Sequence, residues 1–130
     1  MPVISWPGVK DMPELKPTIS IEYTEKATIV RFTDRKILEE RDIRSLQDSI
    51  MSLVEQATRI NLILDFSNVE FLSSAVLGLL IRVSKRVAER KGTLRLCGIS
   101  PRIYEVFKIT QLTKVFDIHK DVDSALKDLV

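Results

Sequence analysis

The feature that most constrains the fold is a short, almost wholly apolar run that is followed by a long amphipathic segment. The run Ile60–Phe66 is typical of a strand covered on both faces, as in a parallel sheet. Apolar residues then recur at helical spacing, which predicts a helix over Ser73–Lys91 with Gly92 as its C′ stop. The expected buried stripe of this helix is Val76, Leu79, Leu80, Val83 and Val87. A buried strand that leads into such a helix indicates an α/β domain.

Strand and helix patterns alternate along the rest of the chain. Two β-rich runs, Ile19–Tyr23 and Ala27–Phe32, are separated by a short turn and predict a hairpin. From Ile43 the apolar period becomes helical, with Asp42 as the expected N-cap. The remaining predicted elements are a strand over Thr93–Cys97, a helix from Pro101 to Ile109 capped by Ser100, a strand over Val115–Ile118 and a helix over Asp121–Leu129. This order predicts a mixed β-sheet of about five strands packed with about four α-helices.

The length of 130 residues favours a single domain. Residues 1–17 are rich in proline and show no sustained period, so they predict an extended N-terminal lead-in. The domain itself is expected over residues 18–130. Trp6 lies in the lead-in and either folds back onto the domain or belongs to a loose tail. The sequence predicts no oligomeric state.

The charge balance excludes some classes of function. Lys and Arg number 20 against 18 Asp and Glu, which gives a formal net charge of +2. Nucleic-acid binders usually carry a marked excess of basic residues, so the balance argues against that class. The chain shows no signal peptide, and its longest apolar stretch, residues 75–81, is far short of the ~20 residues of a membrane span. We therefore expect a cytoplasmic protein without a membrane span.

Basic residues are concentrated in the C-terminal half of the long predicted helix: Arg82, Lys85, Arg86, Arg90 and Lys91. One interpretation is a solvated face that complements the negative end of the helix dipole. The other is a surface patch that binds a partner. The sequence alone leaves both interpretations open.

Residue patterns typical of enzymes are missing. The chain contains no phosphate-binding glycine loop, no nucleophile elbow and no metalloprotease motif. His119 is the single histidine and is expected to be a surface or capping residue, and no Cys/His cluster suits zinc. The single cysteine, Cys97, lies in an apolar strand and is expected to be a small buried hydrophobe. The sequence therefore predicts no enzyme activity, no cofactor and no metal site.

The segment Asp65–Gly78 joins the most buried predicted strand to the longest predicted helix. In a parallel sheet this junction lies at the carboxyl edge, where α/β domains usually place their functional groups. Ser73 and Ser74 begin the helix, and one interpretation is that they are ordinary N-caps. The other is a modification site, because a helix N-terminus accommodates the roughly −1.5 to −2 charges of a phosphoserine.

The stretches Leu62–Ser67, Val69–Ser74 and Leu77–Gly78 resemble the core motif of STAS domains, and most of all the bacterial anti-sigma factor antagonists. The resemblance extends from Ile19 to Leu129 and includes the elements at 92–98 and 106–112. It implies a protein that is not an enzyme. Unphosphorylated, such a protein binds an anti-sigma factor that is also a serine kinase of the GHKL ATPase type, and this frees a sigma factor. Phosphorylation of one motif serine ends the binding, and a PP2C-type phosphatase restores it.

The resemblance also assigns an acceptor. The family motif reads Asp-Ser-Ser/Thr-Gly-Leu-Gly, and its first serine takes the phosphate. Aligned on Leu77-Gly78, this serine corresponds to Ser74, with Ser73 as the runner-up in the place of the usual Asp. Ala75 replaces the second hydroxyl residue, and Val76 replaces a glycine. The acid of the family's early loop corresponds loosely to Glu39.

Helical spacing suggests which further residues contact a partner. Ser74, Gly78, Ile81 and Lys85 share one helical face. Ile81 is then either an apolar contact for the partner or a residue packed under a neighbouring helix. The expected partner-binding set is Ser73, Ser74, Gly78, Ile81, Lys85 and Glu39. A competing interpretation is a STAS scaffold or a subunit of another assembly, such as a stressosome or a lipid-transport complex, in which the two serines are caps only.

Overall fold

The computed structural model describes residues 19–127 and 129, so the predicted lead-in over residues 1–17 and Trp6 lie outside the described residues. The main sheet has the strand order β1-β2-β4-β6-β7. Its strands are β1 (Ile19–Tyr23), β2 (Thr28–Phe32), β4 (Asn61–Asp65), β6 (Thr93–Cys97) and β7 (Asp117–His119). β1 runs antiparallel to β2, and all the other neighbours are parallel. The predicted hairpin and the predicted mixed sheet are confirmed.

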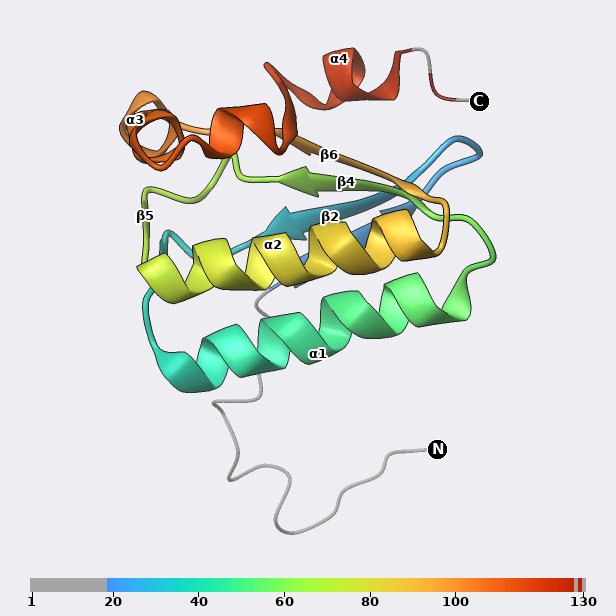
Figure 1. Cartoon of the computed structure of the whole chain (residues 1–130), viewed down its shortest axis with the longest axis horizontal. Helices are drawn as coiled ribbons and strands as arrows, with labels where there is room; N and C mark the ends of the chain where they lie inside the picture. The colour runs from blue at the N-terminus through green and yellow to red at the C-terminus, as the bar shows by residue number, and fades with distance from the viewer. Residues whose placement is uncertain (1–18, 128, 130) are drawn as a thin grey trace, which may run out of the picture.

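The helices of the described residues are α1 (Glu40–Gln56), α2 (Ser74–Glu89), α3 (Pro101–Ile109) and α4 (Val122–Leu126), with a short 3-10 turn at Leu112–Lys114. α1 and α2 lie side by side on one face of the main sheet, and α4 lies on the other face (Figure 1). The predicted α/β class with about four helices is therefore confirmed. Among the described residues, none of the helices has the length and apolar character needed to cross a membrane.

β4 is buried from both sides, as its apolar sequence predicts. Leu62 and Leu64 belong to the large core beneath α1 and α2, whereas Ile63 belongs to a smaller core beneath α4. Cys97 lies in the smaller core and is fully buried, which confirms it as a buried hydrophobe. Desolvation by burial raises the pKa of its thiol to about 12. The predicted stripe of α2 is confirmed, since all five of its residues are buried.

A second, two-stranded sheet was not predicted. It pairs β3 (Lys36–Ile37) with β5 (Phe71–Leu72) in parallel. Two-residue strands are too short to produce an alternating pattern, so no sequence signal marks them. This sheet joins the segment before α1 to the segment before α2, and thereby fixes the starts of the two helices relative to one another.

The prediction that Asp42 is the N-cap of the first helix is wrong. α1 begins at Glu40 with Glu39 at the N-cap position, and Asp42 lies in the first turn. The cause is β3, because pairing of Ile37 in that strand leaves only a short connection before the helix. Asp42 still complements the positive end of the helix dipole.

The predicted end of α2 also needs correction. The left-handed residue is Lys91, with φ of 60°, and not Gly92. The amides of Lys91 and Gly92 donate to the carbonyls of Ala88 and Val87 at 3.0 and 2.9 Å, which is a Schellman ending. Gly92 is needed for a different reason, since a Cβ there would lie 2.4 Å from the carbonyl oxygen of Ile60.

Two smaller boundaries also differ from the predictions. The last strand is Asp117–His119 instead of Val115–Ile118, because the 3-10 turn carries the chain through Lys114 and the buried Phe116 packs against Phe107 of α3. The last helix is capped by Asp121 as expected but ends at Leu126, where Lys127 returns to extended backbone.

Candidate functional site

The connection from β4 to α2 lies at the carboxyl edge of the main sheet. It leaves the sheet after Asp65, forms β5 and enters α2 at Ser74. Figure 1 shows that α1, α2 and α3 all start at this end of the molecule. α1 and α2 start there side by side, so the positive ends of their dipoles face the same region, which favours negatively charged groups there.

Asp65 fixes the turn at the end of β4. Asp65 is 6% exposed, and its carboxylate accepts hydrogen bonds from the backbone amide of Ser67, at 3.0 Å, and from the Ser67 hydroxyl. The guanidinium of Arg31 lies 3.3 Å from its other oxygen. Gly98, with φ of +69°, lets the end of β6 approach, because a Cβ there would lie 2.6 Å from the Ser67 hydroxyl oxygen.

Arg35 holds the loop before Ser73 in place. Its carbonyl accepts hydrogen bonds from the amides of Glu70 and Phe71 at 2.8 and 3.0 Å. Its guanidinium donates to both carboxylate oxygens of Glu70, at 2.7 and 3.0 Å. The hydrogen bond from Arg35 lowers the pKa of the Glu70 carboxyl below its ordinary value. The loop therefore enters α2 along a defined path.

The two serines at the start of α2 have different environments. Ser73 occupies the N-cap position, and its amide donates to the Ile37 carbonyl at 3.0 Å. Its hydroxyl makes no capping hydrogen bond and is buried without a hydrogen-bond partner among the described residues. The interpretation in which the Ser73 side chain caps the helix is therefore wrong. Ser74 is the first residue of the helix and is exposed.

The structure places the other expected contact residues unevenly. Lys85 is exposed, whereas Gly78 and Ile81 are half-buried. Ile81 packs against the large core, which favours the interpretation that it stabilises the domain. Glu39 is exposed at the N-cap position of α1, in the segment that follows β3.

A groove of about 430 Å³ lies between the N-terminal halves of α1 and α2, and we call it the α1–α2 groove. Sequence reasoning did not find it, because its two sides are far apart in the chain and meet only through β3 and β5. It is lined from the α1 side by Leu38, Glu40, Ile43, Arg44 and Gln47, and from the α2 side by Ser73, Ala75 and Arg82. The residues on either side of Ser74 thus both line the groove.

The basic residues in the C-terminal half of α2 are neither simply a solvated face nor simply a patch for a partner. The guanidinium of Arg82 donates to Gln47 of α1 at 2.9 and 2.6 Å. Arg86 pairs with Glu55, also of α1, and Arg90 donates to the Ala57 carbonyl at 2.9 Å. These three arginines therefore stabilise the packing of α2 against α1 and the residue that follows it. Their i, i+4, i+8 spacing was a signal for this role that sequence analysis did not use.

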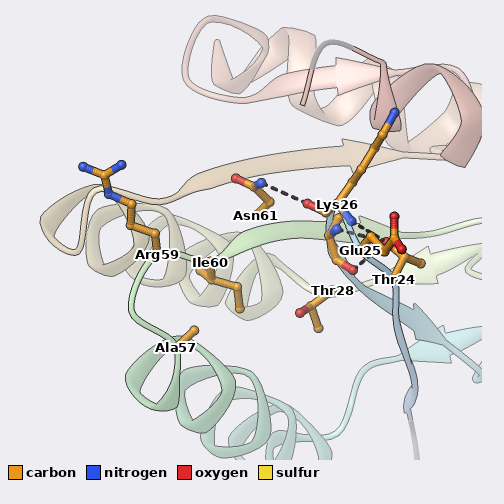
Figure 2. Close-up of a pocket in the computed structure, with 9 residues that line it drawn as sticks. Thr24, Glu25, Lys26, Thr28, Ala57, Arg59, Ile60 and Asn61 are labelled. Atoms are coloured by element: carbon orange, nitrogen blue, oxygen red, sulfur yellow. Dashed lines mark hydrogen bonds between the residues drawn. The ribbon is translucent and has the colours of Figure 1, made fainter. Parts of the chain in front are cut away.

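A second hollow lies at the other end of β4, and Figure 2 shows the residues that line it. There the side-chain amide of Asn61 donates to the Lys26 carbonyl at 2.9 Å, which ties the β1–β2 turn to β4. The side chains of Lys26 and Arg59 point away from each other in Figure 2. Since charged groups do not converge there, this hollow is the weaker candidate for a binding site.

Potential catalytic and metal-binding groups are dispersed. His119 lies at the end of β7, with Nε2 2.9 Å from the Asp117 carboxylate. Within residues 19–127 and 129, no group of three or more His, Cys, Asp and Glu side chains is placed to hold a metal ion.

Comparison with known proteins connects this arrangement to a family. The family model described as STAS domain matches residues 19–125. The anti-sigma-B factor antagonist of Listeria monocytogenes is 26% identical over 118 residues, which cover 83% of this chain and 94% of the Listeria protein.

Solved structures share the fold. An anti-sigma-factor antagonist (STAS) domain protein from Planctomyces limnophilus superposes with a TM-score of 0.76 at 24% identity, covering 83% of this chain and 94% of that one. The Bacillus cell fate determinant SpoIIAA, solved in its phosphorylated form, gives a TM-score of 0.62 at 18% identity, with 81% and 94% covered.

Proposed function

Since this chain belongs to the STAS domain family, we propose that it is an anti-sigma factor antagonist controlled by phosphorylation of Ser74. In its unphosphorylated form it binds an anti-sigma factor, which is also a serine kinase of the GHKL ATPase type, and so releases a sigma factor. Phosphorylation ends the binding, and a PP2C-type phosphatase restores it. The role is regulatory and not catalytic. Support comes from the Listeria relative, which is named an anti-sigma-B factor antagonist.

The observation that carries the proposal is the contrast between the two serines. A kinase must bring the acceptor oxygen in line with the transferred phosphoryl group, which requires an accessible hydroxyl. Ser74 is exposed, whereas the hydroxyl of Ser73 is buried. The contrast supports Ser74 as the acceptor over Ser73.

The position of Ser74 also suits a reversible switch. A phosphate on the first residue of α2 faces the positive end of the helix dipole, an interaction worth roughly 0.3–1 kcal/mol. The modification therefore leaves the fold intact. It nevertheless adds about −1.5 to −2 charges to a surface segment, Ser73–Ala75, that carries no charged side chain. The partner thus meets a changed surface on an unchanged domain.

The proposed partner-binding surface includes Ser74 together with the exposed residues Glu39 and Lys85. Ser73, Gly78 and Ile81 contribute chiefly by shaping the backbone and the packing beneath that surface. SpoIIAA, whose fold is similar, has been solved in a phosphorylated form, and this supports a modified state for the present chain.

Affinity purification from the native cells tests the proposal. The unmodified chain and the Ser74→Asp variant serve as matched baits, and captured proteins are identified by mass spectrometry. We expect the unmodified bait to capture a GHKL-type kinase and the Ser74→Asp bait to lose it. If both baits instead capture scaffold or transporter subunits and no kinase, the chain is a STAS scaffold or a subunit of another assembly.

A further inference from the structure

Two guanidinium groups in the α1–α2 groove have no carboxylate bound to them. Arg44 and Arg82 both line the groove. Within residues 19–127 and 129, neither forms an ion pair. Arg86 and Arg90, further along α2, lie by contrast against Glu55. Of the three arginines along α2, Arg82 lies nearest to Ser74. Its positive charge is not neutralised by a carboxylate within the described residues, so it remains available to a ligand.

Arg82 is held in position without being neutralised. Its Nε and Nη2 atoms donate to the uncharged Gln47 amide oxygen at 2.9 and 2.6 Å. Its Nη1 atom lies 3.5 Å from where a Cβ of Gly78 would be, so the guanidinium reaches back along α2 toward Ser74. A guanidinium fixed in this way is prepared to bind a carboxylate, because less side-chain freedom is lost on binding.

The groove also has apolar walls. Leu38 is 52% exposed at its edge, Ile43 lies at its base and Ala75 is exposed on the α2 side. Glu40 is the carboxylate among the lining residues, against two arginines. An inorganic anion would leave the leucine uncovered, whereas a peptide with both apolar and acidic side chains would satisfy both features.

We propose that the α1–α2 groove binds an acidic, apolar peptide segment of the anti-sigma factor partner. This inference rests on the proposed function, because the segment is assigned to the partner that recognises Ser74. It also explains the direction of the switch. Ser73 and Ala75 both line the groove, so a phosphate on Ser74 adds negative charge beside it and repels the acidic segment.

The test uses the purified full chain, labelled with ¹⁵N, and two synthetic peptides. The acidic peptide alternates pairs of Glu and Leu, and its control has Lys in place of every Glu. We expect the acidic peptide alone to shift the amide signals of Leu38, Arg44, Gln47 and Ala75. Arg44→Glu should weaken its binding about tenfold. Arg41→Glu, an equal charge change at an exposed α1 residue outside the groove, should leave binding within about twofold.

Three results would overturn the proposal. The basic peptide could shift the amide signals as much as the acidic one, the groove signals could stay unshifted, or Arg44→Glu and Arg41→Glu could weaken binding of the acidic peptide equally. Circular dichroism melting curves show whether each variant is folded. Neither a kinase nor a phosphate enters this experiment, so its result is independent of whether Ser74 is modified. A negative result for peptide binding in the groove can therefore be distinguished from a negative result for the phosphorylation switch.

Discussion

Ser73 turns its hydroxyl into the protein, whereas its neighbour Ser74 lies exposed at the first position of α2. The backbone amide of Ser73 donates to the Ile37 carbonyl, so the residue is fixed by β3 and not by a side-chain cap. Two identical and adjacent side chains are thus given different roles by the small second sheet. The hydroxyl of Ser73 is buried in the domain, whereas Ser74 is exposed at its surface.

The first prediction concerns the role of Ser73 in stability. An ordinary N-cap serine loses about 1 kcal/mol on replacement by alanine. Ser73→Ala instead removes a buried hydroxyl that has no partner in the described part of the chain, so we expect no loss or a gain of up to about 1 kcal/mol. Urea denaturation measures the difference in the free energy of unfolding.

Ser100 provides the matched control, because its hydroxyl accepts a hydrogen bond from the Ile103 amide at 3.3 Å. Ser100→Ala should lose about 1 kcal/mol. If Ser73→Ala loses as much as Ser100→Ala, Ser73 caps α2 in solution and the assignment of its hydroxyl to the interior is wrong.

The second prediction compares two glycines near the site. Gly98→Ala places a Cβ 2.6 Å from the Ser67 hydroxyl oxygen at a φ of +69°, so it should lower the free energy of unfolding by about 1–3 kcal/mol. Gly78→Ala meets only an ordinary contact of 3.5 Å inside a helix and should raise stability by about 0.5–1 kcal/mol. Thermal melting of the two variants gives opposite shifts, and shifts of the same sign would contradict the packing around Asp65.

The third prediction concerns Cys97. Burial raises the pKa of its thiol to about 12, so at pH 8 almost none of it is the reactive thiolate. Iodoacetamide should label the unfolded chain in urea at the rate of a free cysteine and the native chain at least about 100-fold more slowly. Equal rates would show that α4 does not cover this face of the sheet.

Hydrophobic periodicity predicted the main sheet and the stripe of α2 because both bury one or two faces over several residues. β4 is the clearest example, since its run of apolar residues matches its burial beneath helices on both sides. The small second sheet was harder to predict. β3 and β5 are two residues each, and their pairing depends on contacts between segments distant in sequence.

The candidate site shows the same division. Ser74 could be located from its place after a buried strand and from the resemblance of the motif. The buried hydroxyl of Ser73 and the position of Arg82 could not be located in this way, because they depend on Ile37 and Gln47, which come from another part of the chain. Charge patterns along one helix do not reveal which charges are paired across to the next.

The fourth prediction tests the pairing of α2 with α1. The hydrogen bond from Arg86 lowers the pKa of Glu55 below its ordinary value of 4.5. A lowered pKa means that this carboxylate stabilises the fold fully above pH 4.5 and that the contribution is lost as the pH falls through the lowered value. Glu55→Gln should therefore lower the melting temperature at pH 7, and this difference should shrink as the pH decreases. A difference independent of pH would mean that the ion pair contributes nothing.

The most direct test of the account is the affinity of the anti-sigma factor partner for this chain with and without a phosphate on Ser74, measured by isothermal titration calorimetry. Site-specific incorporation of phosphoserine at position 74 gives the modified chain. We predict tight binding of the unmodified chain and roughly 100-fold weaker binding with phosphoserine at position 74, since like charges at an interface are strongly unfavourable. Equal affinity of the unmodified chain and the chain phosphorylated on Ser74 would contradict the account.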